Sequence, residues 1–105
     1  MTDKKIILST TGSREEAQKI ARALVERKLA ACVNIVGPIE SVYRWKDAVE
    51  TSEEFLLIVK TTGAACQRVR DLIRLLHSYE LPECVELAIE DGLPQYLEWI
   101  GESVE

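Results

Sequence analysis

Residues 29–46 read LAACVNIVGPIESVYRWK, and the pattern of this stretch decides the fold. Its first part is mostly apolar and β-branched, which predicts a strand over residues 29–36. Gly37–Pro38 interrupts that strand as a bulge or a bend would, because proline cannot donate to a ladder of hydrogen bonds. Apolar and polar residues alternate again over residues 39–46, so we expect the strand to resume there. One face of the resumed strand carries Ile39, Ser41, Tyr43 and Trp45.

A second long strand follows and completes a hairpin. We expect a turn at Asp47–Ala48 and a strand over residues 53–62, whose central apolar run indicates burial on both faces. The first strand is about three times the usual five or six residues, and at about 3.3 Å per residue the hairpin would reach roughly 50 Å. The small sheet of a 105-residue chain cannot cover that length. We therefore expect other copies of the chain to cover the hairpin, because an unsupported hairpin with exposed aromatic residues is marginal in water.

The segment before the hairpin predicts a strand and a helix. Residues 4–11 are rich in β-branched residues and end in a Gly12–Ser13 break, as a strand would. Ser13 and Glu16 form the S-x-x-E capping box, in which the serine oxygen accepts from a free backbone N–H and the glutamate reaches back to the cap. The helix that follows carries one apolar stripe at helical spacing, made of Ala17, Ile20, Ala21, Leu24 and Val25.

The segment after the hairpin predicts a helix, a strand and a second helix. Gly63 opens a helix that ends near His77, and a strand over residues 84–90 and a short helix over residues 93–101 follow. The stripe of the first of these helices comprises Ala65, Val69, Leu72, Ile73 and Leu76. The order is that of the ferredoxin-like split β-α-β pattern. We predict one α+β domain over residues 1–105, a βαββαβ sandwich with an extended hairpin and a C-terminal helix.

Composition and charge exclude several classes of protein. The formal net charge is −5 and the pI is near 5.0, so we expect no nucleic-acid partner and no anionic-membrane surface. The apolar run Ile6–Leu8 is too short for a signal peptide, and no stretch approaches the length of a membrane span. The three cysteines are odd in number and widely spaced, which predicts no disulfide framework. We expect a soluble protein of the reducing cytoplasm.

Proteins with a ferredoxin-like fold have unrelated functions, so each candidate function must be tested against the residues that it requires. A copper chaperone would carry two cysteines in the loop after the first strand, and that loop has none. An RNA-recognition module would expose several aromatic residues on its central strands, whereas residues 53–62 hold one. An acylphosphatase-like enzyme would need a glycine-rich phosphate cradle beside Arg14, and no such cradle is present. We interpret Cys32 and Cys66 as buried core thiols, Cys84 as a packing thiol, and Tyr43, Trp45 and Trp99 as core or interface anchors.

The single histidine, His77, lies at the start of HSYELPECVEL, a stretch that also holds a cysteine and several glutamates. A histidine at the end of a helix is favourable as a partner for the free carbonyl groups, and this is our interpretation of His77. One imidazole is not a metal site, because transition-metal sites gather three or four ligands. The others would have to be nearby carboxylates, Cys84 or groups from another subunit.

Four motifs together are strong evidence for a resemblance to one family, although each motif alone would be weak evidence. They are LAACVN (29–34), YRWK (43–46), KTT (60–62) and the H-x-Y-x-x-P-E run that starts at His77. Through them nearly the whole chain resembles CutA, the family of divalent-cation tolerance proteins. The resemblance implies a ferredoxin-like protomer in a tight homotrimer, whose long hairpins pack against neighbouring subunits, and a shape similar to the PII signalling proteins. It also implies a link to tolerance of copper and other divalent ions, copper binding in some members, and no established enzymatic activity.

The chain departs from that family at the positions that bind metal in some members. Those members carry a cysteine at the end of the first strand, where this chain has Ser9, and two adjacent histidines, where it has Leu76–His77. The proline that is common after the second histidine is Ser78 here. A thiolate and an imidazole, both ligands that copper prefers, are therefore missing. We expect no required cofactor and, at most, weak copper binding at His77.

The leading hypothesis is a non-enzymatic cytoplasmic homotrimer linked to divalent-metal tolerance. The alternative is a PII-like module whose clefts between subunits bind a small molecule or a protein partner. The residues expected to line such a cleft are Tyr43, Trp45, Lys60, His77, Tyr79 and Glu83. A third hypothesis, an enzyme that uses His77 with Glu80 or Glu83 as acid and base, is disfavoured because the sequence shows no nucleophile with an obvious base.

Overall fold

The computed structural model describes residues 2–105, and its elements follow the predicted order. The strands are β1 (Lys4–Thr11), β2 (Cys32–Trp45), β3 (Ala48–Thr62) and β4 (Val85–Ala88). The helices are α1 (Arg14–Glu26), α2 (Cys66–Leu76) and α3 (Pro94–Ser103), with a short 3₁₀ turn (Gly63–Ala65) before α2. All strand pairs are antiparallel, in the order β2-β3-β1-β4. The predicted α+β fold with its β-α-β-β-α-β order and terminal helix is confirmed.

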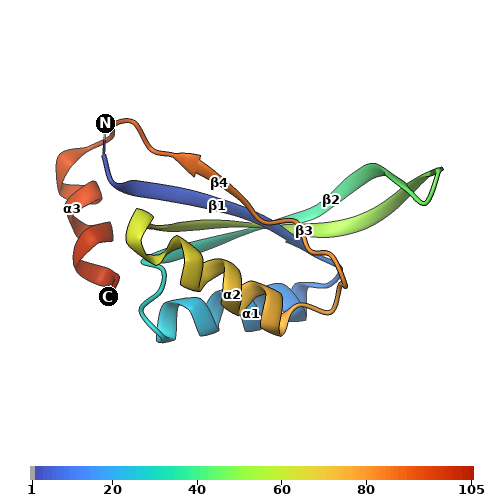
Figure 1. The fold of residues 1–105 in the computed structure, drawn as a ribbon, viewed down its shortest axis with the longest axis horizontal. Coiled ribbons are helices and arrows are strands. Elements are labelled where there is room, and N and C mark those ends of the chain that lie inside the picture. The colour runs from blue at the N-terminus through green and yellow to red at the C-terminus, as the bar shows by residue number, and fades with distance from the viewer. Residues whose placement is uncertain (1) are drawn as a thin grey trace.

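The sheet is covered on one face and open on the other. Helices α1 and α2 lie against one face, and α3 lies at the end of the sheet near the N-terminus (Figure 1). Pairing of β1 with β3 ends at Thr11 and Phe55, so β2 and β3 continue alone beyond that point. We call this part of the hairpin, residues 39–54, the arm, and the rest of the chain the body. Among residues 2–105 no helix is long and apolar enough to cross a membrane.

The core of the body fills the space between the two helices and the sheet. The predicted stripe of α1 is buried at Ile20 and Leu24, and it meets Ile7, Leu57 and Val59 from the sheet. The stripe of α2 is buried at positions including Val69 and Ile73. These side chains have essentially no exposed surface, so their burial supplies most of the hydrophobic stabilisation that a chain of this length can gain.

Of the two hydrogen bonds predicted for the capping box, one is present and the other is not. The Ser13 side chain accepts a hydrogen bond from the backbone N–H of Glu16 at 3.2 Å, as predicted. The Glu16 carboxylate does not return to the cap. It accepts from the backbone N–H and the hydroxyl of Ser78, at 2.7 and 3.0 Å, and so ties the start of α1 to the loop after α2. A tertiary partner has replaced the local one.

The hairpin differs from the prediction at its ends and in its length. Strand β2 begins at Cys32 rather than residue 29, because the chain leaves α1 through Lys28 in the left-handed conformation, with φ 59°. Lys46 and Asp47 form the turn, both with positive φ, so β3 starts at Ala48 instead of residue 53. The expected interruption is a register shift between Val36 and Ile39. The longest dimension of the molecule is 44 Å, so the predicted 50 Å hairpin was too long.

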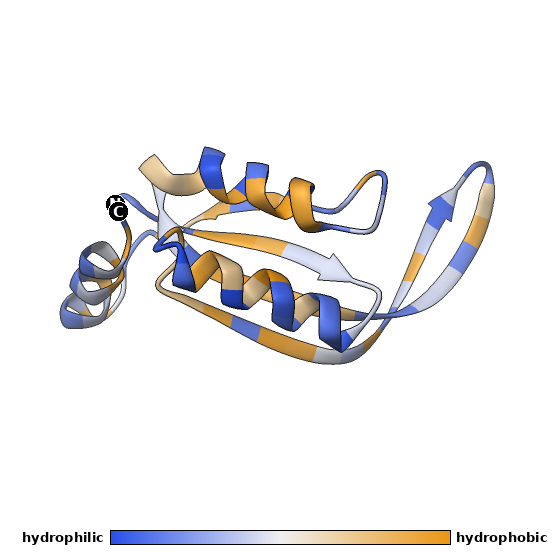
Figure 2. Cartoon of the chain, turned by 90° about the horizontal axis from the view of Figure 1, so that it is seen from below, coloured by the Kyte–Doolittle hydropathy of each residue, from blue (hydrophilic) through white to orange (hydrophobic). Residues whose placement is uncertain are grey.

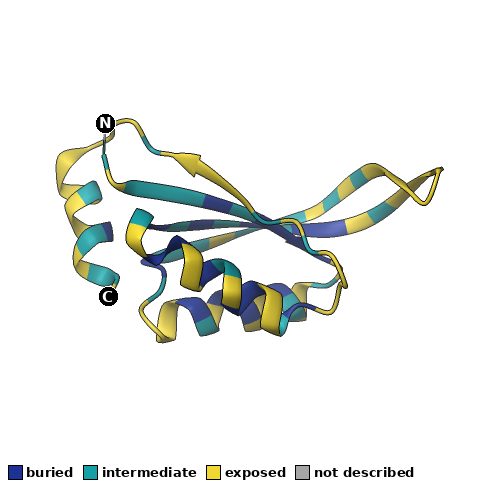
Figure 3. Cartoon of the chain, viewed as in Figure 1, coloured by how far each residue is buried: buried dark blue, intermediate teal, exposed yellow. Residues whose placement is uncertain are grey.

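The sheet face that α1 and α2 leave uncovered, which we call the open face, is apolar. Its positions follow from the register, since paired residues such as Leu8 and Ile58 point to the same side. Leu8, Leu56 and Ile58 are half-buried there, and Val36 is exposed. The apolar residues of the open face are Ile6, Leu8, Val36, Leu56, Ile58, Val85 and Leu87. Strand β3 contains hydrophobic segments (Figure 2), but towards its end buried residues alternate with half-buried ones (Figure 3). The predicted burial of β3 on both faces is therefore not achieved within the single chain.

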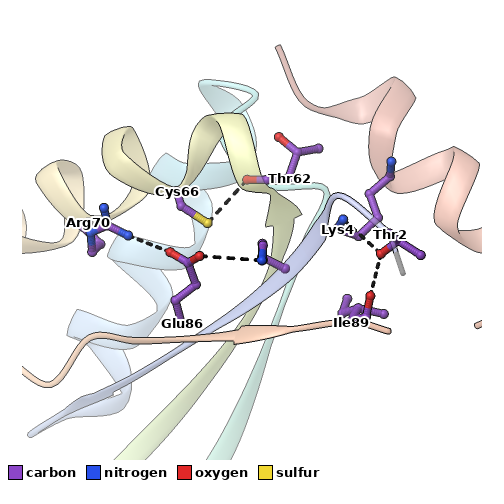
Figure 4. Close-up of polar contacts among 8 residues, drawn as sticks. Thr2, Lys4, Thr62, Cys66, Arg70, Glu86 and Ile89 are labelled. Atoms are coloured by element: carbon purple, nitrogen blue, oxygen red, sulfur yellow. Dashed lines mark hydrogen bonds and ion pairs between the residues drawn. The ribbon is translucent and has the colours of Figure 1, made fainter. Parts of the chain in front are cut away.

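Strand β4 is an edge strand with all four residues exposed. Polar side chains fasten it to the body: the Glu86 carboxylate lies 2.8 Å from the Arg70 guanidinium and 4.0 Å from the Lys5 ammonium (Figure 4). The Thr2 hydroxyl donates to the carbonyl oxygen of Ile89 at 2.6 Å, just beyond the strand. The exposed β4 is thus held in place by hydrogen bonds and ion pairs at its edge and its end.

Candidate functional site

A hollow lies between the arm and the loop that follows α2. It has a volume of about 760 Å³, and we call it the arm hollow. Its aromatic lining consists of Tyr43, Trp45 and Tyr79, and its acidic lining of Glu50, Glu54, Glu80 and Glu83. The other lining residues are Thr10, Ser41, Val42, Leu81 and Pro82. Strands β2 and β3 supply one wall and the loop supplies the other, so residues far apart in the sequence meet here.

Tyr79 and Glu54 join the two walls of the arm hollow. The Tyr79 hydroxyl donates to Glu54 Oε2 at 2.8 Å, and only 8% of Glu54 is exposed. Burial and this hydrogen bond to a carboxylate raise the pKa of Tyr79 to about 12, so the phenol keeps its proton and donates at neutral pH. Gly12 leaves room for the ring, since a Cβ there would lie 3.1 Å from the Tyr79 hydroxyl oxygen.

His77 lies behind the arm hollow and orients Tyr79. The backbone N–H of Tyr79 donates to His77 Nδ1 at 3.0 Å, so Nε2 carries the proton and donates to the carbonyl oxygen of Thr10 at 2.6 Å. The two rings pack with their centroids 4.7 Å apart. His77 does occupy the C-cap position of α2, but its imidazole binds β1 rather than the free carbonyl groups of the helix. His77 is therefore a neutral, buried imidazole that connects β1 to the loop after α2.

Four of the six residues predicted to line a cleft are together in the arm hollow. They are Tyr43, Trp45, Tyr79 and Glu83. His77 does not line it and acts through Tyr79. Lys60 is elsewhere, on the open face, where its ammonium contacts the Asn34 side chain, because the register pairs Lys60 with Cys32 at the far end of the sheet.

Sequence reasoning missed Glu50 and Glu54 as lining residues. They pair with Tyr43 and Ile39 across the hairpin and therefore share the face of Tyr43 and Trp45. The pairing of these glutamates could have been predicted from the position of the turn, because the turn at Lys46–Asp47 fixes that register. A turn placed one residue too late shifts the pairing and hides these carboxylates. The acidic stretch then looks like nothing more than part of a solvated turn.

The residues around His77 do not fit a copper ion held by one chain. Both imidazole nitrogens are already hydrogen-bonded, and Ser9 is fully buried with its hydroxyl donating to the carbonyl oxygen of Glu83 at 2.7 Å. Cys84 is half-buried, and burial raises the pKa of its thiol, which disfavours the thiolate that binds metal. Residues 2–105 contain no group of three or more histidine, cysteine, aspartate or glutamate side chains placed to hold a metal ion.

The other two cysteines differ in their surroundings. Cys66 is buried as predicted, with its thiol 3.4 Å from the carbonyl oxygen of Thr62 (Figure 4), and burial raises its pKa to about 11. Cys32 was predicted to be a core thiol, and this is wrong. It is only partly buried, because its position on β2 faces the open face together with Asn34 and Lys60.

Comparison with known proteins identifies a family and relatives, some of nearly the same length and some longer. A family model described as the CutA1 divalent ion tolerance protein matches residues 5–103. The divalent-cation tolerance protein CutA of Thermus thermophilus is 46% identical over 99 residues, which is 94% of this chain and 96% of that protein. A protein CutA homolog of Xenopus laevis is 47% identical over 88 residues, which is 84% of this chain but 58% of that longer protein.

Solved structures have the same fold. A divalent cation tolerance protein (Cut A1) from Thermus thermophilus superposes with a TM-score of 0.95 at 44% identity, over 97% of this chain and 99% of that one. A structure from Archaeoglobus fulgidus, described as a periplasmic divalent cation tolerance protein CutA, gives a TM-score of 0.94 at 45% identity, over 97% and 99% of the two chains. The likeness covers the body and the arm alike.

Proposed function

The chain belongs to the CutA1 divalent ion tolerance family, and on this premise we propose that it acts as a non-enzymatic homotrimer in the tolerance of divalent metal ions, copper among them. The observation that carries the assembly is the open face, which presents a row of apolar side chains with no covering layer. Monomeric proteins rarely expose a contiguous apolar patch of this kind. The number of copies, three, comes from the family resemblance.

Two valines of matched exposure test the assembly. Val36 on the open face is 44% exposed, and Val25 on α1, which was predicted to belong to the buried stripe but lies in a hollow beside Val33 and Ile35, is 42% exposed. Light scattering on the unmodified protein should give three times the 11.8 kDa chain mass. Val36→Glu should dissociate the trimer, because it would bury a charge in the interface, whereas Val25→Glu should leave it intact. A wild-type monomer at micromolar concentration would contradict the proposal, and so would equal behaviour of the two variants.

We propose that any metal bound by the folded protein binds weakly and at His77. A metal ion would have to displace the Tyr79 N–H from Nδ1 or the proton from Nε2, and each exchange gives up a hydrogen bond. Isothermal titration of the intact protein with copper should therefore show weak binding, and His77→Ala should bind copper still more weakly. Tight stoichiometric binding that disappears in His77→Ala would contradict the proposal that the affinity is weak. Tight binding that survives in His77→Ala would contradict the assignment to this residue.

The thiols support a non-enzymatic role. A nucleophilic cysteine needs a lowered pKa, whereas burial raises the pKa of Cys66 and of Cys84. His77 is the one imidazole, and its nitrogens hold the backbone of Thr10 and Tyr79 rather than a hydroxyl or a thiol. Alkylation with a thiol-reactive probe at neutral pH should accordingly be slow at Cys66 and Cys84.

A second candidate function is favoured by the arm hollow. We propose that it forms one wall of a cleft between subunits and that, as in a PII-like module, a small molecule or a protein partner binds there. The support is that four residues predicted for such a cleft from the sequence share one concave surface of ligand size. Titration with candidate ligands, observed through Trp45, tests this role separately from assembly.

We propose the cytoplasm as the location of this chain, in contrast to the relative from Archaeoglobus fulgidus that is described as periplasmic. The three cysteines are free thiols, which suits a reducing compartment. Rapid alkylation of intact cells followed by mass measurement should find the thiols unoxidised. Recovery with periplasmic marker enzymes on cell fractionation would contradict the proposal.

A further inference from the structure

We propose that the arm hollow binds a small organic ammonium ion, with its charge held by the carboxylate of Glu54 and by the rings of Tyr43, Trp45 and Tyr79. The proposal deepens the second candidate function and rests on the arm hollow being a ligand site. It adds the chemical class of the ligand: a cation with an apolar body, as opposed to an anion, a neutral molecule or a bare metal ion.

The charge of the arm hollow is one-sided. Four carboxylates line it, and no lysine or arginine does. Glu54 is more than nine-tenths buried, yet its one hydrogen bond from the described residues comes from the neutral phenol of Tyr79. Within residues 2–105 no basic side chain forms an ion pair with it. A buried carboxylate without a positive partner is unfavourable, and a bound cation would provide that partner. An anionic ligand would be repelled by all four carboxylates.

The aromatic rings select an ammonium ion among cations. Tyr43, Trp45 and Tyr79 line the same hollow and are exposed in the single chain, which leaves part of each side chain accessible to a ligand. The face of an aromatic ring attracts a cation within about 6 Å, and tryptophan does so best. The chain already uses Trp45 in this way, since the Lys46 ammonium lies 5.8 Å from its ring centroid although Lys46 does not line the hollow.

A bare metal ion fits the arm hollow poorly. Its four carboxylates are spread along the arm and the loop, and among residues 2–105 no three acidic, histidine or cysteine side chains converge on one point. Hard divalent ions need about six or more converging oxygen ligands. A volume of about 760 Å³ and apolar walls at Val42 and Leu81 suit an organic body instead.

Choline and its uncharged carbon analogue 3,3-dimethylbutan-1-ol test the charge at constant shape. The titration is followed by NMR through the indole N–H of Trp45 in the full chain carrying Trp99→Phe, which leaves one tryptophan. Choline should bind about tenfold or more tightly than the neutral alcohol, because only choline gains from the carboxylates and the rings. Light scattering on the same samples reports the state of assembly independently.

Two neighbouring glutamates supply the matched variants. Glu54→Gln keeps an oxygen that can accept from Tyr79 but removes the charge, and it should weaken choline binding about tenfold while leaving the neutral alcohol unaffected. Glu53→Gln removes the preceding carboxylate, which does not line the arm hollow, and should leave choline binding within about twofold.

Equal affinity for choline and the neutral alcohol would overturn the proposal and leave the hollow as an uncharged ligand site. A loss of choline binding that is the same in Glu53→Gln and Glu54→Gln would also overturn it, because bulk charge rather than a site would then be responsible. If an anionic or neutral ligand binds and choline does not, the ammonium class fails while the cleft function stands. If nothing binds near Trp45 in an intact oligomer, both fail.

Discussion

The two ends of the β2–β3 hairpin differ in sequence and in surroundings, although both form strands. In the body, Leu57 and Val59 of β3 lie under α1 and α2 and are completely buried. In the arm, Val42 and Val49 are 64% and 67% exposed, on strand segments whose residues are mostly polar. The pattern specifies a strand in both places, whereas only a covering layer makes the strand stable. The arm therefore depends on something outside the single chain, and the body does not.

The largest effect should come from the covered end. Leu57→Ala removes a fully buried side chain and should lower the free energy of unfolding by about 2–5 kcal/mol. Val49→Ala in the arm is the matched control, with an expected change within about 0.5 kcal/mol for the isolated chain. Urea unfolding measures both in the background of Val36→Glu, which is expected to be the isolated chain, since assembly couples to stability. Comparable losses at the two sites would break the contrast between body and arm.

The next effect should come from the histidine that connects β1 to the loop. His77→Ala leaves the Thr10 carbonyl and the Tyr79 N–H without their partners and should cost about 2–3 kcal/mol. Leu75→Ala, at an exposed position in the last turn of α2, should change stability little. Thermal unfolding compares the two. A His77→Ala protein as stable as the control would mean that the loop is held by other contacts.

A smaller effect should come from the point where the body meets the arm. A Cβ at Gly37 would lie 2.5 Å from a ring carbon of Phe55 and 3.1 Å from the Glu54 carbonyl oxygen, so Gly37→Ala must displace the hairpin and should cost about 1–2 kcal/mol. Gly63→Ala is the control, because its nearest contact would be an ordinary 3.5 Å. If the two alanines behave alike, the junction is more deformable than its packing implies.

The smallest effect should come from the tie between the loop and the arm. Tyr79→Phe removes one hydrogen bond to Glu54 and should cost about 1 kcal/mol at neutral pH. The pKa of Tyr79 is raised in the folded state from 10.0 to about 12, so the protonated phenol stabilises the fold fully below pH 10 and less as the pH rises through 12. The difference between wild type and Tyr79→Phe should shrink over that range. Cys66 also titrates at alkaline pH, but equally in both proteins.

A difference that stays constant from pH 8 to 12 would contradict this assignment. It would mean that the contribution of the Tyr79 hydroxyl does not depend on its ionisation, and therefore does not come from the hydrogen bond to Glu54. The hydrogen bond between Tyr79 of the loop and Glu54 of the arm would then contribute nothing to stability, although both residues line the arm hollow.

The candidate site was predictable only where its residues stand out individually. Tyr43, Trp45 and Tyr79 are large aromatic residues on polar segments, and this contrast with their neighbours along the chain marks them as surface anchors. Glu54 has no such mark, because it is buried where the loop after α2 meets β3 and Tyr79 donates to it. Lys60 was misplaced for the opposite reason: it belongs to a recognisable motif, but strand alternation and register place it on the open face.

The sequence by itself determined the order of the elements, the buried stripes of α1 and α2 and the interruption at Gly37–Pro38. Each of these depends on contacts between near neighbours along the chain or on the period of apolar residues, which can be read without knowing the fold. Only the tertiary structure decided that Glu16 binds Ser78 instead of its own cap and that the ring of His77 binds the carbonyl oxygen of Thr10. Such partners lie dozens of residues apart in the sequence, and their competition is settled by the packed geometry of the whole chain and not by local preference.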